Sequence, residues 1–151
     1  AVGDETLSAG TMQAWSPVLD VAQDARWGRC EETFGEDPVL VSQIGGAWIK
    51  GYQSMGLYTT PKHFGGHGAP LGGRDSHDIG LSEREMREVH LVPFRHVIRN
   101  YDCQSLMMAY SDFLGVPEIV QVFGGDEQHI LILIRLQDTA LPYATEFTNI
   151  S

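Results

Sequence analysis

The sequence predicts an α/β fold with parallel strands, and three features of the chain support this class. Apolar segments of strand length alternate with longer amphipathic segments, in the order strand, helix, strand, helix, strand. The polar residues of chemical interest follow the predicted strands, which is where parallel α/β folds of the barrel type build their sites. The loops that carry these residues exceed the usual length of about two to six residues, which favours a functional role for them.

The composition places this 151-residue chain among globular proteins, with 42% apolar and 9% aromatic residues. Its 20 acidic and 10 basic side chains give a formal net charge of −10. Nucleic-acid binding needs clustered Lys and Arg, and an anionic membrane repels an acidic surface, so we expect neither partner. The sequence also has no run of about 18 apolar residues, so no transmembrane helix is expected.

The first predicted strand is 15–22, and a long polar loop follows it. A helix is predicted from Pro38, because Asp37 can cap the first turn and a proline N–H would have no partner there. Helical spacing gives this helix an apolar face, formed by Leu40, Ile44, Ala47 and Trp48.

The second half of the pattern begins with a short predicted strand at 57–61. The next helix is predicted to start at Ser82, because Glu85 stands three residues later and completes a capping box. Pro93 lies inside this helical pattern and should kink it or split it into two helices. A third strand is predicted at 104–110.

A glycine-rich stretch, PKHFGGHGAPLGGR (61–74), lies at the end of the second predicted strand. His63, His67 and His77 leave a metal site open as a hypothesis, although the glycines between the first two disfavour a helix that would bring them to one face. The Gly-Lys-Ser/Thr order of a phosphate-binding P-loop is missing. The stretch is therefore better suited to a neutral ligand.

A sugar is the neutral ligand that these side chains fit. Lys and Arg donate hydrogen bonds to hydroxyl oxygens, and His can donate or accept. The aromatic rings of Trp27 and Phe64 could lie against the apolar face of a sugar. The alternative for Trp27 is a place in the core.

Four segments together resemble the N-terminal domain of glycoside hydrolase family 3, in the order that the family shows. The resemblance covers about residues 8–117 and implies part of a (β/α)8 TIM-type barrel, incomplete because a whole barrel takes about 250 residues. It also implies an exo-acting, retaining β-glucosidase or β-xylosidase. The segments are SPVLDVAQDARWGRCEETFGEDPVLVSQIGGAWIKGYQ, PKHFGGHGAPLGGRD, LSEREMREVHLVPF and SLMMAYSDFLGVP.

The resemblance implies five substrate-binding residues. Arg29 resembles a family arginine that binds hydroxyls of the sugar at the cleavage point. Lys62 and His63 match a Lys-His pair that holds further hydroxyls of the same ring. Arg74 resembles a family motif arginine, and Tyr110 matches a tyrosine near the reactive carbon.

No catalytic residue is identified. The family's nucleophile is an aspartate in a Ser-Asp motif on a later strand, and Asp112 follows Tyr110 too early to match it. The acid/base usually comes from a following domain. We therefore expect residues 1–117 to form part of the family domain and 118–151 to be a divergent tail, with the remainder of the barrel and a second domain missing.

The implied partner is a small-molecule or oligosaccharide β-glycoside, and no cofactor or metal is expected. The family suggests a periplasmic or extracellular location. Two other functions stay open: a non-catalytic sugar-binding fragment that uses Arg29, Lys62 and His63, and a metal-binding protein built on the three histidines named above.

Overall fold

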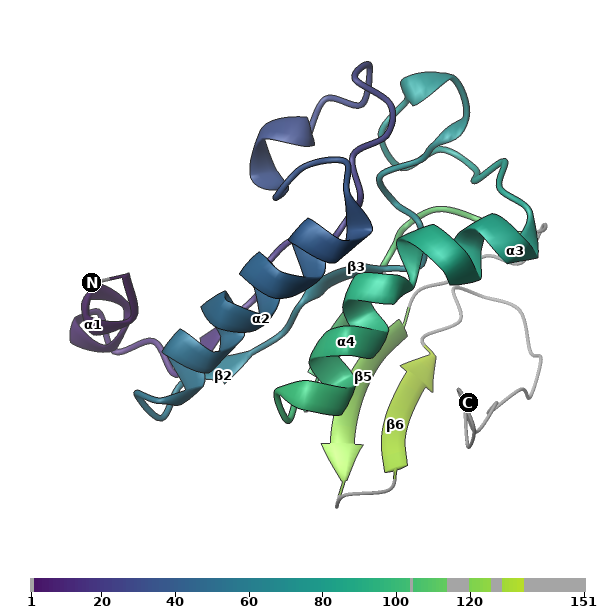
Figure 1. The fold of residues 1–151 in the computed structure, drawn as a ribbon. Coiled ribbons are helices and arrows are strands. Elements are labelled where there is room, and N and C mark those ends of the chain that lie inside the picture. The colour runs from purple at the N-terminus through teal and green to yellow at the C-terminus, as the bar shows by residue number, and fades with distance from the viewer. Residues whose placement is uncertain (1, 104, 114–119, 126–128, 135–151) are drawn as a thin grey trace.

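The computed structural model describes residues 2–103, 105–113, 120–125 and 129–134 (Figure 1). The helices are α1 (Val2–Ser8), α2 (Pro38–Gln53), α3 (Glu83–Glu85) and α4 (Val92–Asn100), and the strands are β1 (Gln13–Ala14), β2 (Tyr58–Thr59), β3 (Lys62–Phe64), β4 (Ser105–Met108), β5 (Val120–Gly125) and β6 (His129–Ile134).

The strands that precede residue 110 pair in parallel, as the sequence predicts. β1 lies parallel to β2, and β3 lies parallel to β4. β5 then runs antiparallel to β4, and β6 antiparallel to β5. Helices α2 and α4 pack against each other over one side of these strands (Figure 1). The predicted domain boundary between residues 117 and 118 lies outside the described residues and stays a prediction.

The predicted strand 15–22 is extended chain with a single bridge, not a regular strand. Val18 alone forms a parallel bridge, to Lys62 of β3. Pro17 has no N–H to give to a ladder, which limits regular pairing here. The N–H of Leu19 donates to the carbonyl of Lys62 at 2.6 Å, and the N–H of Lys62 donates to the carbonyl of Pro17 at 2.9 Å. The segment therefore still lies against β3.

The start of α2 is as predicted. The Asp37 carboxylate accepts hydrogen bonds from the backbone N–H groups of Val39 and Leu40, at 2.7 and 2.9 Å, and Pro38 lies in the first turn. These bonds satisfy two of the N–H groups that a helix start leaves unpaired.

Of the predicted apolar face of α2, only Trp48 packs against the core, where it is half-buried. Leu40 and Ile44 are 47% and 40% exposed, and Ala47 is exposed. A Cβ atom on Gly45 would overlap Leu19, and one on Gly46 would overlap the Tyr101 ring. The helix thus packs through its glycines, which let its backbone approach the neighbouring segments closely. The buried face is formed by Val41, Ser42, Gly45, Gly46, Ile49 and Tyr52.

The second predicted helix is split near Pro93, as expected. Ser82 and Glu85 form the predicted capping box at its start. A π turn over Met86–His90 follows, closed by the N–H of Leu91 donating to the carbonyl of Met86 at 2.8 Å. Pro93 lies in the first turn of α4, where its missing N–H leaves no intrahelical bond unmade.

The core lies between the helices and the strands. The buried core cluster consists of Leu19, Val41, Ile49, Phe94, Val97, Cys103, Leu106 and Met108.

Among the described residues, no helix is long and apolar enough to cross a membrane.

Candidate active site

The candidate site lies where β3, β4 and the extended segment beside them end. Lys62 and His63 form the first two positions of β3, rather than following a strand as predicted, and a cis peptide bond joins them. Gly65 and Gly66 then take φ values of 105° and 81°, a left-handed backbone that glycine adopts at little cost. This turn places the ring of His67 4.4 Å from that of His63, measured between centroids.

His63 forms a buried pair with Asp20. The Nδ1 atom of His63 lies 2.9 Å from Oδ2 of Asp20, and the backbone N–H of His63 donates to the same oxygen at 3.1 Å. The two side chains are 2% and 1% exposed. A carboxylate can only accept, so Nδ1 carries a proton, and Nε2 is the ring nitrogen left for a ligand. Sequence reasoning missed Asp20, whose place at the end of the first apolar segment was its only signal.

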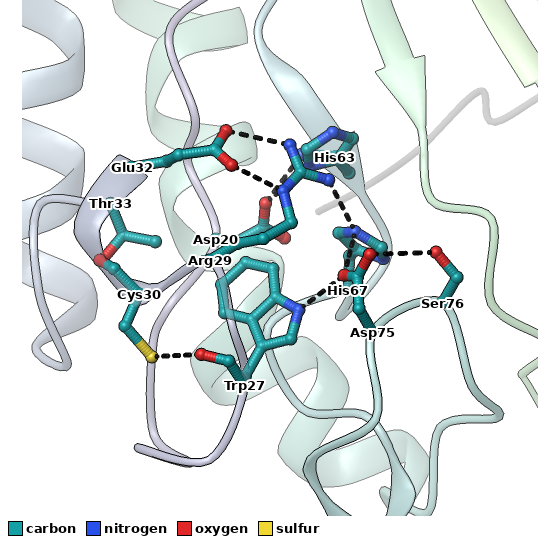
Figure 2. A network of polar contacts seen from close by, with 10 residues as sticks. All are labelled: Asp20, Trp27, Arg29, Cys30, Glu32, Thr33, His63, His67, Asp75 and Ser76. Carbon is teal, nitrogen blue, oxygen red and sulfur yellow. Dashed lines mark hydrogen bonds and ion pairs between the residues drawn. The ribbon is translucent and has the colours of Figure 1, made fainter.

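Arg29 is held by Glu32. Its Nε–H and Nη2–H groups donate to the two oxygens of the Glu32 carboxylate at 2.6 and 2.8 Å (Figure 2). This hydrogen-bonded pair raises the pKa of Arg29 and lowers the pKa of Glu32. The positive charge of Lys62 lowers the pKa of Glu32 further. Glu32 is thus the carboxylate that fixes the Arg29 guanidinium.

His67 joins Arg29 to the glycine-rich loop. Its Nε2 atom lies 3.1 Å from Nη1 of Arg29 and 3.2 Å from Oδ1 of Asp75, and its Nδ1 atom lies 3.5 Å from Oγ of Ser111. The side chain is fully buried, and this burial lowers the pKa of His67. Figure 2 shows the chain of contacts that runs from Glu32 through Arg29 and His67 to Asp75.

The hypothesis that Trp27 and Phe64 stack on a sugar is wrong for Trp27 and unsupported for Phe64. Trp27 is 1% exposed, and its Nε1–H donates to Oδ1 of Asp75 at 2.8 Å. Phe64 is half-buried and packs edge to face against Phe94 of α4, with 5.3 Å between the ring centroids. Trp27 is too deeply buried to meet a ligand, and the alternative, a place in the core, is the one that the structure supports. Tyr110 is 52% exposed, and its ring lies 6.3 Å from that of His67.

Arg74 lies outside this cluster. It is exposed in the loop that carries Asp75. In the part of the chain that the structure describes, its guanidinium forms no hydrogen bond or ion pair with Glu32 or Asp75, the acidic side chains that hold Arg29, His67 and Trp27. The structure therefore links Arg29 to the Lys62-His63 pair through His67, places the ring of Tyr110 near His67, and gives Arg74 no polar contact with these acidic side chains.

The histidines do not form a metal site in the described part of the chain, where no three His, Cys, Asp or Glu side chains are placed to hold an ion. His63 is bonded to Asp20, and His77 is exposed in the loop. The acidic side chains of the cluster, Glu32 and Asp75, likewise accept hydrogen bonds from a guanidinium and an indole. Their evident role is to hold other side chains.

Comparison with known proteins places this geometry in a family. Residues 1–121 match the model described as the glycosyl hydrolase family 3 N-terminal domain. The chain is 41% identical to a β-xylosidase from Formosa agariphila over 75% of its own length and 17% of the relative's. It is 29% identical to a periplasmic β-glucosidase from Salmonella typhimurium over 75% of its own length and 15% of the relative's. The chain thus spans less than a fifth of these relatives.

Solved structures agree with this match. A β-glucosidase involved in saponin metabolism from intestinal bacteria superposes with a TM-score of 0.73 at 37% identity, covering 76% of this chain and 16% of that one. The Listeria innocua β-glucosidase in complex with glucose gives 0.68 at 32% identity, covering 72% and 16%. The predicted fold class, part of a (β/α)8 barrel, is thereby confirmed. With a family match over most of its length and this agreement in structure, the chain belongs to glycoside hydrolase family 3.

Proposed function

We propose that the intact protein hydrolyses O-glycosidic bonds as an exo-acting, retaining β-glucosidase-like enzyme, and that this chain supplies part of its glycone-binding site. The observation that carries the proposal is the placement of Arg29 beside the Lys62-His63 pair of β3: Arg29 contacts His67, and the ring of His67 lies 4.4 Å from that of His63. Polar side chains fixed close together in this way suit a ligand with several neutral hydroxyls. The β-glucosidase and β-xylosidase relatives support the same substrate class.

Each side chain has donors or acceptors left for a sugar. Arg29 bonds to Glu32 through two of its five N–H groups and to His67 through a third, so a sugar can take the two unused groups or compete with His67 for the third. Lys62 is half-buried and carries three donors. His63 is nearly covered, so we expect it to reach a ligand only through Nε2. The exposed ring of Tyr110 completes the side of the site nearest His67.

These residues would act on binding and on the transition state. Hydrogen bonds to ring hydroxyls that tighten as an oxocarbenium-like transition state forms, together with distortion of the sugar, supply several kcal/mol in glycosidases. A retaining enzyme also needs a nucleophilic carboxylate and an acid/base carboxylic acid about 5–5.5 Å apart. We assign neither role to the described residues, because Asp20, Glu32 and Asp75 each hold another side chain of the cluster.

The test is hydrolysis by the intact protein of 4-nitrophenyl β-D-glucopyranoside and of the matching β-D-xylopyranoside, with the first product anomer identified by proton NMR. We expect hydrolysis with retention. The Arg29→Lys variant should lose at least about tenfold in kcat/KM, or about 1.4 kcal/mol of transition-state stabilisation. Arg26→Lys is the matched control, since Arg26 lies in the same loop and pairs with Asp24 instead. Inversion of the anomer, or no cleavage of either substrate, would contradict the proposal.

A second candidate is a non-catalytic sugar-binding fragment. The engagement of every acidic side chain of the cluster in holding a neighbour favours it. Thermal protection by D-glucose without hydrolysis of either substrate, lost in Arg29→Lys and kept in Arg26→Lys, would select this function over the enzymatic one.

A further inference from the structure

Two groups compete for one nitrogen of His67. Arg29 Nη1 and Asp75 Oδ1 lie 3.1 and 3.2 Å from the same Nε2 atom (Figure 2). A guanidinium can only donate a hydrogen bond, and a carboxylate can only accept one. The Nε2 atom of a neutral imidazole carries either a lone pair or a proton. His67 can therefore bond to Arg29 or to Asp75, but not to both at once.

In either of these two states, the other ring nitrogen, Nδ1, can bond to the Ser111 hydroxyl. His67 is fully buried, and the burial lowers its pKa, so the ring is neutral at neutral pH. Its Nδ1 atom faces the Ser111 hydroxyl at 3.5 Å, and a hydroxyl can either accept or donate. With the proton on Nδ1, the ring donates to Ser111 and accepts from Arg29. With the proton on Nε2, it donates to Asp75 and accepts from Ser111.

Asp75 is held in place independently of His67. Its Oδ1 atom accepts the Trp27 indole N–H at 2.8 Å, and Trp27 itself is 1% exposed. The carboxylate therefore keeps its position beside Nε2 when His67 is bonded to Arg29. This makes it a fixed acceptor, available whenever Arg29 releases the ring.

We propose that Asp75 is a positioning residue, which takes over the hydrogen bond of His67 when Arg29 turns to a ligand hydroxyl. Without ligand, the charged guanidinium holds His67 with its proton on Nδ1. With ligand, the Nη1–H of Arg29 goes to a sugar hydroxyl, and the ring loses its Nδ1 proton and gains one at Nε2 by exchange with water. The ring stays neutral throughout, and the new Nε2–H donates to Asp75. This inference rests on the proposed function, because it needs a hydroxyl-bearing ligand at Arg29.

The experiment measures the tautomer of His67 directly. The full chain is labelled with ¹⁵N on histidine, arginine and lysine side chains, and its nitrogen resonances are followed as D-glucose is added. We expect the Nδ1–H form without glucose and the Nε2–H form at saturation. In Asp75→Ala the Nδ1–H form should persist at saturation, and the affinity for glucose should fall about tenfold.

Two further variants keep the result interpretable. Asp78→Ala removes a carboxylate from the same exposed loop and should behave like the parent chain. Asp75→Asn retains an acceptor for the Trp27 N–H, so it keeps the stability that this bond provides. Its shift of the His67 tautomer with glucose should lie between those of the parent chain and Asp75→Ala. This variant therefore separates the effect on His67 from any loss of stability. If Asp75→Ala and Asp78→Ala show the same His67 tautomer at saturating glucose and the same affinity for glucose, the inference is overturned.

The outcomes also separate this inference from the proposed function. If glucose shifts the Arg29 and Lys62 resonances while His67 keeps the Nδ1–H form, the ligand binds and the role of Asp75 is refuted. If glucose shifts none of these resonances, both the sugar site and the inference fail.

Discussion

The side chains of His63 and Asp20 form a hydrogen-bonded pair with almost no exposure to solvent, and 2.9 Å separates Nδ1 from Oδ2. The same Asp20 oxygen accepts the backbone N–H of His63. One carboxylate thus fixes both the backbone and the ring of a residue that we expect to face the sugar. The Asp20 carboxylate is the acceptor for two buried donors of His63, so its removal should lower the stability of the fold.

We expect Asp20→Ala to lower the free energy of unfolding by about 1–3 kcal/mol for each buried donor left unpaired. Chemical denaturation of the intact protein measures this. Asp24→Ala is the control, because Asp24 forms an exposed pair with Arg26, of a kind that contributes about 0–1 kcal/mol. Similar losses of unfolding free energy in both variants would show that the buried His63–Asp20 pair contributes no more to stability than the exposed pair.

A second prediction concerns pH and His90. Burial lowers the pKa of His90 below its ordinary value of 6.5, with the negative charges of Asp20 and Glu85 opposing the shift. Below pH 6.5 the unfolded chain binds a proton that the folded protein resists binding. The stability contributed by the neutral ring is therefore present above pH 6.5 and is lost as the pH falls towards the lowered pKa. The pKa of His67 is lowered for the same leading reason, so His67 acts in the same direction.

The variant that tests this is His90→Leu. Neither ring nitrogen of His90 has a hydrogen-bond partner among the described residues, so an apolar side chain of similar size should not lower stability at pH 7. The fall in unfolding free energy between pH 7 and pH 5.5 should become shallower, by up to about 1.4 kcal/mol per pH unit for one proton. His77→Leu, at an exposed position, should leave the slope unchanged. An unchanged slope in His90→Leu would refute the assignment.

A third prediction uses the glycines of α2. A methyl group at Gly45 would overlap Leu19, and one at Gly46 would overlap the ring of Tyr101, so each change to alanine should destabilise the fold by about 1–3 kcal/mol. In the same helix, a Cβ at Gly51 meets nothing within 4 Å. Gly51→Ala should therefore stabilise the protein by about 0.5–1 kcal/mol, through helix propensity alone. Thermal and chemical unfolding of the three variants compare them directly, and three changes of one sign would contradict this packing.

These glycines also show where sequence reasoning succeeds and where it stops. The caps at Asp37 and Ser82, and the break at Pro93, are local effects of backbone hydrogen bonding, so the sequence predicts them correctly. The buried face of α2 depends on which neighbouring segments approach the helix, and this is a tertiary effect. Helical spacing considers only the polarity of side chains, so it predicts burial for Leu40 and Ile44, which are exposed.

The same difference between local and tertiary effects applies to the residues of the site. Arg29, Lys62 and His63 could be proposed as sugar-binding residues because their motifs are continuous in sequence, and the structure links them through His67, which contacts Arg29 and lies 4.4 Å from the ring of His63. Their binding of a sugar stays a prediction. Asp20 and Asp75 were missed because their partners lie 43 and 48 residues away along the chain, and only the tertiary fold pairs them. Trp27 was assigned to ligand binding as one possibility because an aromatic beside a functional loop has the same sequence pattern whether it is buried or exposed.

The last prediction concerns Glu32, which binds Arg29 through two charge-assisted hydrogen bonds of 2.6 and 2.8 Å. Glu32→Gln keeps the shape of the side chain but can accept at only one of its two terminal atoms, so Arg29 loses part of its fixed orientation. Because a site that is ordered in advance spends less free energy on binding, we expect the affinity for D-glucose to fall about tenfold. Isothermal titration of the intact protein measures this affinity.

Glu31→Gln is the matched control for that measurement, since it removes the same charge from the neighbouring exposed residue. A general loss of negative charge near the site would change both variants equally, whereas the loss of an orienting partner changes Glu32→Gln alone. An affinity that rises in Glu32→Gln would mean that Glu32 restrains Arg29 from the ligand, and that the pair is an obstacle to binding instead of its support.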